Sequence, residues 1–111
     1  MDRRDEDILP AFRHMLGPGE EVHAAARATD AVLAVTDRRL LVVAGNHVLL
    51  DVPIDHVRRI QFDVEKGRPA TFTVVPEQPR HEPQVLAIPF GEIGSASEAV
   101  RVVGDRFAQL D

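Results

Sequence analysis

The residues of this chain whose types could do chemistry include five histidines, at positions 14, 23, 47, 56 and 81. Histidines that bind a metal usually recur at fixed short spacings, four apart on a helix or two apart on a strand. None of these five has such a partner. We therefore expect solvated surface histidines and no metal site.

A catalytic nucleophile is also missing from the pattern. Asp55 and His56 imitate part of a dyad, but no Ser or Thr follows them in a recognisable elbow. The serines, Ser95 and Ser97, stand at a predicted helix start, and the chain has no Cys. No glycine-rich phosphate loop is present. The sequence predicts a protein that is not an enzyme, with no catalytic residue, no cofactor and no small-molecule substrate.

The densest basic site is the pair Arg38 and Arg39. The formal net charge is −5, and an acidic domain repels phosphate backbones and anionic lipid unless a local basic patch overrides the mean. Exposed aromatics that would stack on bases are absent, so we expect no nucleic-acid partner. Binding of an anionic membrane through the Arg38 and Arg39 side stays open as an alternative. The acidic pair Glu20 and Glu21 is expected to be a solvated face.

The elements that must position these residues are short and β-branched. With 111 residues, one domain is expected. From Glu21 to Ile88, turn residues interrupt the apolar runs every 8–12 positions, which indicates an antiparallel sandwich or barrel. The predicted strands are Val22–Thr29, Ala31–Thr36, Leu40–Ala44, Val48–Val52, Arg59–Glu65, Ala70–Val75 and Gln84–Ile88. Alternation places Ile60, Phe62 and Val64 on one face and turns Phe72 and Val74 inward.

A helix is predicted at each end of the chain. Ser95 and Glu98 fit a capping box, and an apolar stripe follows, so a helix is expected over Ser95–Leu110, packed on the open end of the barrel. Residues 4–15 predict a short amphipathic helix, although Pro10 favours a start near Leu9. Its stripe must be buried on the chain's own barrel or on a second chain. That stripe consists of Ile8, Leu9, Phe12, Met15 and Leu16.

Three segments in order resemble the bacterial pleckstrin-homology-like family. They are Leu16–Val22, with its L-x-x-G-E-x-V pattern, Ala31–Val43, with the Thr36–Leu40 hairpin T-D-R-R-L, and Leu50–Ile60. The resemblance implies a seven-stranded, strongly bent antiparallel sheet or barrel capped by one C-terminal helix, with residues 16–111 as this domain and residues 1–15 as an extra helix. It also implies self-assembly, because homo-oligomers recur among members of that family.

Lipid binding is not carried over with the resemblance. Eukaryotic pleckstrin-homology domains bind phosphoinositides through basic residues around the first hairpin. Here that hairpin, residues 27–31, offers Arg27 and Asp30, which cannot balance several phosphate charges.

The sequence therefore predicts a protein-binding or self-assembling module with a protein partner or a second copy of itself. The start of the chain lacks the apolar run of a signal peptide, and no stretch reaches the length of a membrane span, so a cytoplasmic location is expected. The candidate interaction residues are Ile8, Leu9, Phe12, Met15, Arg38 and Arg39.

Overall fold

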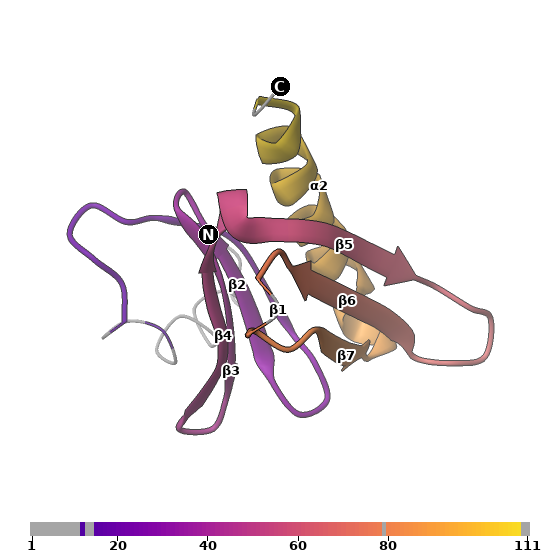
Figure 1. Ribbon diagram of the computed structural model, residues 1–111. Helices are drawn as coiled ribbons and strands as arrows, with labels where there is room; N and C mark the ends of the chain where they lie inside the picture. The colour runs from indigo at the N-terminus through magenta and orange to yellow at the C-terminus, as the bar shows by residue number, and fades with distance from the viewer. Residues whose placement is uncertain (1–11, 13–14, 79, 110–111) are drawn as a thin grey trace.

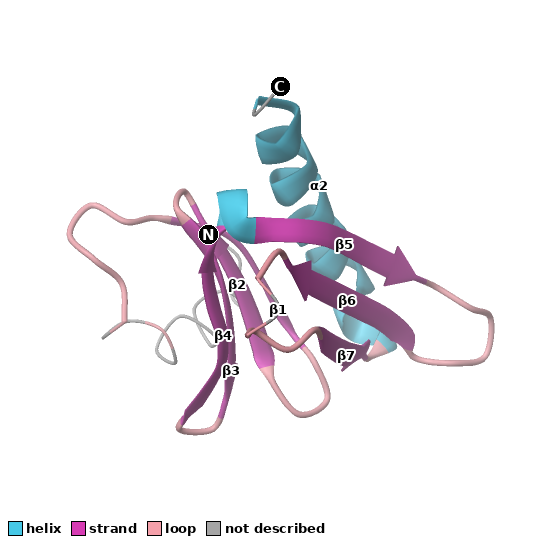
Figure 2. Ribbon diagram, viewed as in Figure 1, coloured by secondary structure: helices cyan, strands magenta, loops and turns pink. Residues whose placement is uncertain are grey.

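The computed structural model describes residue 12 and residues 15–78 and 80–109. Within them the chain forms seven strands and one long helix (Figures 1 and 2). The strands are β1 (Val22–Arg27), β2 (Val32–Thr36), β3 (Arg39–Ala44), β4 (His47–Pro53), β5 (Val57–Asp63), β6 (Ala70–Pro76) and β7 (Gln84–Ile88). The helical elements are η2 (Ile54–His56), η3 (Phe90–Glu92) and α2 (Ile93–Gln109).

The strands form two antiparallel meanders, β1-β2-β3-β4 and β5-β6-β7. In Figure 1 the strands of the first sheet stand upright and those of the second run across them. The seven-strand count confirms the sequence prediction, but the barrel does not close. Pro53 lacks an amide proton and leads into η2, so the described residues form no ladder between β4 and β5. At the other seam, Thr29 N donates to Ala87 O at 2.8 Å without extending a ladder.

The core lies between the sheets and is built almost wholly from aliphatic side chains. On the second sheet, strand alternation turns Phe72 and Val74 inward, as the sequence predicted, and Phe62 meets Phe72 with ring centroids 5.8 Å apart. Val64, predicted to share one strand face with Ile60 and Phe62, lies beyond the end of β5 and is exposed.

Helix α2 covers one end of the sandwich and packs mainly on β1 (Figure 1). It buries the small residues Ala96, Ala99 and Val103, which allow a close approach to the sheet. The predicted capping box is wrong, because the chain is already helical before Ser95. Pro89 leads into η3, which runs directly into α2, and Glu92 Oε1 accepts a hydrogen bond from Arg27 N at 2.9 Å.

A second apolar cluster lies on the outer face of the first sheet, away from α2. Phe12 is fully buried there, with Ala25, Ala34, Leu41 and Val43 as the buried neighbours in the same cluster. Met15 and Leu16 pack against it. The described part of the predicted N-terminal stripe therefore packs on the chain's own sheet. The extra helix itself, with Ile8 and Leu9, lies outside the described residues.

No helix in the described residues is both long enough and apolar enough to cross a membrane.

We predict that Phe12→Ala destabilises the protein by about 3 kcal/mol, because a fully buried aromatic side chain would leave a cavity on the outer face. Urea denaturation followed by circular dichroism measures the change. Val85→Ala is the matched control: that side chain is exposed, so its effect should stay within about 0.5 kcal/mol. A destabilisation that grows as the protein is diluted would contradict packing within one chain.

Candidate functional site

The Thr36–Leu40 motif forms the tight turn between β2 and β3. The hydroxyl of Thr36, a fully buried residue, accepts hydrogen bonds from the amides of Arg38 at 3.0 Å and Arg39 at 2.9 Å. Asp37 instead reaches the preceding segment, where its Oδ1 accepts from Glu21 N at 3.0 Å. By residue type alone, Asp is the stronger side chain for holding such a turn and Thr the weaker one. The threonine takes that part because its side chain lies on the buried side of the turn.

Glu20 belongs to the first of the resembling segments and folds onto this turn. Its own loop is closed by Glu20 N donating to Gly17 O at 3.1 Å and Gly17 N donating to Glu20 Oε1 at 2.9 Å. The Thr36 hydroxyl donates to Glu20 Oε2 at 2.7 Å. The Glu20 side chain is only 2% exposed. The expected solvated acid is therefore a buried carboxylate that joins two segments of the sequence.

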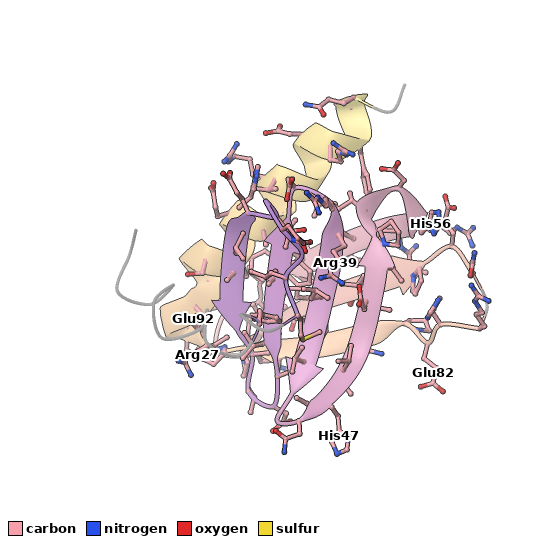
Figure 3. All side chains as sticks on the ribbon, turned by 90° about the vertical axis from the view of Figure 1, so that its left-hand side faces the viewer. Arg27, Arg39, His47, His56, Glu82 and Glu92 are labelled. Atoms are coloured by element: carbon pink, nitrogen blue, oxygen red, sulfur yellow. The ribbon has the colours of Figure 1, made fainter. Side chains whose placement is uncertain are left out.

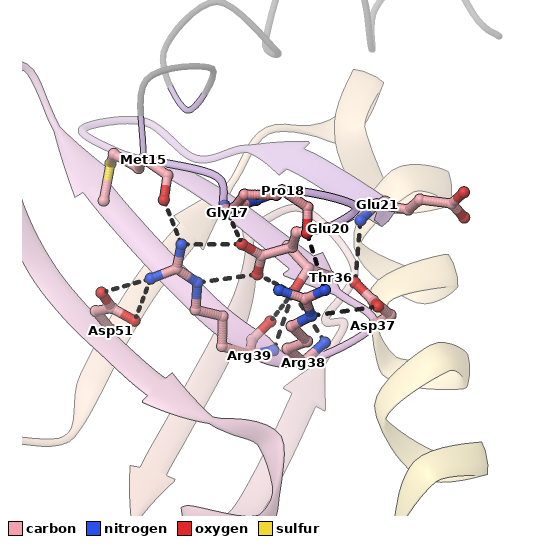
Figure 4. A network of polar contacts seen from close by, with 10 residues as sticks. All are labelled: Met15, Gly17, Pro18, Glu20, Glu21, Thr36, Asp37, Arg38, Arg39 and Asp51. Atoms are coloured by element: carbon pink, nitrogen blue, oxygen red, sulfur yellow. Dashed lines mark hydrogen bonds and ion pairs between the residues drawn. The ribbon is translucent and has the colours of Figure 1, made fainter.

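Arg39 neutralises this buried carboxylate. Its Nε donates to Glu20 Oε2 at 2.9 Å and its Nη2 to Glu20 Oε1 at 3.0 Å, a bidentate pair. Nη1 donates to Asp51 Oδ2 at 3.0 Å, and Nη2 also donates to the Met15 carbonyl. We call Glu20, Thr36, Arg39 and Asp51 the Arg39 clamp (Figure 4).

The clamp has a plain electrostatic signature. Bidentate hydrogen bonding from Arg39, against the opposing effect of burial, lowers the pKa of Glu20 to about 2, and hydrogen bonds from Gly17 and Thr36 add to it. The same pair raises the pKa of Arg39 above its ordinary value. Both groups are thus charged at every ordinary pH. They serve as a fixed ion pair and not as a proton donor and acceptor.

The two arginines of the motif have different surroundings. Arg39 lies on the outer face of the first sheet (Figure 3), and its side chain is 23% exposed with its nitrogens engaged by the clamp. Arg38 is exposed; its Nη2 donates to Pro18 O at 3.1 Å and its Nε lies 3.7 Å from Asp37. The motif therefore presents one exposed cation and not a basic pair.

The candidates for catalysis and metal binding do not converge. Across the described part of the chain, no three His, Asp, Glu or Cys side chains are placed to hold a metal ion. Asp55, read as half of a possible dyad, lies with its Oδ1 3.7 Å from Arg106 Nε on α2. This contact joins η2 to the helix.

Glu20 and Asp51 are the clamp residues that the sequence analysis missed. A signal for Glu20 was present, because it is the Glu of the L-x-x-G-E-x-V pattern at residues 16–22. Glu20 pairs with Arg39, 19 positions later, because β2 runs back antiparallel along β1. No local pattern marks Asp51, which faces Leu41 across the β3–β4 ladder.

Comparison with solved structures places the chain in a known fold. It is similar to a pleckstrin homology domain from Shewanella amazonensis SB2B, with a TM-score of 0.64 and 16% identity over 88% of this chain and 83% of that one. It is also similar to a DUF1696 family protein with a pleckstrin-homology domain from Shewanella loihica PV-4, with a TM-score of 0.65 and 13% identity over 90% of each chain. No family model and no curated protein matches the sequence.

The fold is thus a pleckstrin-homology-like one, two antiparallel sheets and a C-terminal helix, of the kind seen in bacterial proteins. This confirms the resemblance that residues 16–60 indicated, as far as the fold is concerned.

We predict that Glu20→Gln destabilises the protein by about 3 kcal/mol, because breaking a buried ion pair leaves its partner without full compensation. Asp51 keeps part of the charge on Arg39 balanced, which holds the effect at the lower end of the range for such pairs. Chemical denaturation of both proteins at neutral pH measures the difference. Glu98→Gln removes an exposed pair with Arg101 and should leave stability unchanged. Equal effects of the two substitutions would contradict the clamp.

The stability advantage of wild type over Glu20→Gln should depend on pH. The pKa of Glu20 in the folded protein is about 2, below an unfolded value of ~4.3, so the unfolded state binds this proton first on acidification. The contribution is complete above pH ~4.3 and disappears as the pH falls through about 2. Urea midpoints of both proteins between pH 6 and pH 2, roughly the range of that titration, should converge toward the acid end. A gap that stays constant would show that Glu20 does not carry it.

Proposed function

We propose that this protein is a non-catalytic pleckstrin-homology-like module that binds a protein partner or a second copy of itself. The fold supports a module of this class. The Arg39 clamp supports the non-catalytic part of the proposal. Its charged residues Glu20, Arg39 and Asp51 pair with one another and hold the fold together. The proposal depends chiefly on one observation, a pair of exposed apolar side chains at the edge of the first sheet.

That pair lies at a bulge in β4, the edge strand of the first sheet. The pairing register shifts between Val42 and Val43, so Leu49 has no partner opposite it on β3. Val48 is 51% and Leu49 is 42% exposed. Two consecutive exposed aliphatic side chains on an edge strand favour contact with another protein surface, because edges also present unpaired backbone groups.

The edge strand of the second sheet begins next to this bulge. Gln84 Nε2 on β7 donates to Leu49 O at 3.5 Å, which places the start of β7 beside it. The next residue, Val85, is 66% exposed, but strand alternation turns it to the opposite face of β7 from Gln84. We call Val48 and Leu49 the edge surface.

Binding of anionic lipid through Arg38 and Arg39 has less support. Arg39 donates to two carboxylates and a carbonyl, and freeing it for a phosphate would break the clamp. Arg38 alone is a weak attraction next to Asp37.

The proposal is tested with Leu49→Asp, which places a charge in the edge surface without touching the core. We expect wild type to form a homo-oligomer in light scattering, or to retain partners from a host lysate that are then identified. The variant should lose that association by at least about tenfold, since burying an unpaired carboxylate is costly.

Val64→Asp is the matched control, because Val64 is also exposed, at 56%, but lies past the end of β5. Both variants should keep the wild-type denaturation midpoint. Association that survives Leu49→Asp, or a wild type that neither self-associates nor retains any protein, would overturn the proposal.

A further inference from the structure

The edge strands of the two sheets, β1, β4, β5 and β7, differ in what covers them. Helix α2 packs on β1 and also contacts β5. The β1–β2 hairpin lies beside β7, where the backbone N and the hydroxyl of Thr29 both donate to Ala87 O. Within the described part of the chain, β4 packs chiefly on β3 and lies at the margin of the first sheet (Figure 3).

Strand β4 turns backbone groups toward this open margin. Ile54 N donates to Arg38 O at 3.1 Å, so the alternation of the antiparallel ladder points the N–H and C=O of Asp51 away from β3. No turn, loop or side chain among the described residues bonds to either group. Leu49 O also points outward, and its contact there, Gln84 Nε2 at 3.5 Å, is longer than an ordinary hydrogen bond. An edge with free donors and acceptors can accept one more strand.

The usual protection of a sheet edge is weak along β4. Native edges are commonly blunted by charged side chains that discourage a further strand. The only Asp, Glu, Lys or Arg in β4 is Asp51, and Arg39 Nη1 already binds its carboxylate at 3.0 Å. Pro53 ends the edge, because it has no amide proton. The stretch from Val48 to Val52 is therefore open, with two exposed aliphatic side chains at its start.

A second copy of β4 is a poor partner for this edge. In the antiparallel registers that pair both Leu49 and Asp51, Asp51 would stand opposite Asp51 or Leu49 of the second copy. Directly opposed carboxylates repel each other, and a carboxylate beside an aliphatic side chain loses water without gaining a partner. The edge therefore favours a segment of different sequence.

The charge around this edge indicates what that segment carries. The Arg39 clamp holds two carboxylates, those of Glu20 and Asp51, against one guanidinium, so its net charge is negative. The Gln84 amide that contacts Leu49 O also donates to Glu82 O at 3.3 Å, which brings a further exposed acid near the edge. A basic side chain beside Asp51 is thus attracted, whereas the edge surface favours an aliphatic one.

We propose that an extended segment of a partner protein adds to β4 as a further antiparallel strand, with an aliphatic residue beside Leu49 and a basic residue beside Asp51. This inference rests on the proposed function, and it names the kind of partner and the mode of binding at the edge surface. Main-chain hydrogen bonds to β4 supply the affinity, and the two side-chain positions supply the selectivity.

The test is an NMR titration of the full chain with the synthetic peptide acetyl-Thr-Lys-Val-Val-Val-Lys-Thr-amide. With the central Val beside Leu49, antiparallel addition points the N–H of that Val toward β4 and the N–H of the next Val away from it. N-methylation of the central Val should weaken binding at least about fivefold, because a hydrogen bond is lost, and N-methylation of the next Val should not. The peptide with Glu in place of both Lys should also bind more weakly than the parent.

Asp51→Pro and Asp51→Ala form the matched pair on the protein. Both remove the carboxylate, but only proline removes the outward N–H, and an edge strand tolerates proline where that N–H faces solvent. The two variants should share a denaturation midpoint, and Asp51→Pro should bind the peptide at least about fivefold more weakly than Asp51→Ala. In the wild type, hydrogen exchange at the Asp51 amide should be fast in the free chain and slowed by saturating peptide.

Strand addition would be overturned by equal binding of the two N-methylated peptides, by equal binding to the two Asp51 variants, or by no saturable shifts at millimolar peptide. A lower denaturation midpoint of Asp51→Pro than of Asp51→Ala would also overturn it, because the N–H would then already be bonded within the fold. Each of these outcomes leaves the proposed function standing if Leu49→Asp still abolishes association. The proposed function fails separately, when association survives Leu49→Asp.

Discussion

The pairing of Glu20 with Arg39 is the constraint that the rest of the first sheet depends on. A carboxylate that is 2% exposed is tolerated only with a bidentate cation and further hydrogen bonds, and Thr36, Gly17 and Arg39 provide them. This requirement fixes where the segment before β1 crosses the sheet. It also fixes the β2–β3 turn, since the Thr36 hydroxyl that holds the turn donates to the same carboxylate.

The first sheet is consequently covered on both faces. Its inner face packs on the second sheet and α2, and its outer face is covered near the clamp by the segment that carries Phe12 and Met15. The clamp holds that segment at its end, because Arg39 also binds the Met15 carbonyl. A sheet face that would otherwise be an apolar patch thus becomes a second small core, and the large apolar side chains that stay exposed belong to other segments, namely Val48, Leu49, Val64, Val85 and Phe90.

Much of the fold follows from local pattern, because a strand with one buried face has an apolar residue at every second position. The alternation of Phe72 and Val74 located β6 and its inward face, and all seven predicted strands are present among the described residues. The sequence left a sandwich and a barrel open, and the absence of a ladder between β4 and β5 in the described residues decides for two sheets. The predicted helix start at Ser95 was wrong, because α2 begins at Ile93 directly after η3, whose Glu92 accepts a hydrogen bond from the distant Arg27 N.

The sequence by itself determined the order of the strands, the pleckstrin-homology-like character of the chain and the residues of its turn, since these rest on residue types at short spacing. Tertiary structure alone decided what Glu20 and Arg39 do. Read locally, each is an exposed charge, and only the return of β2 along β1 brings them within hydrogen-bond distance. The same reason applies to a cavity of about 260 Å³ at the end of the sandwich, whose lining comes from β1, the β2–β3 turn, η2 and α2, segments far apart in the sequence.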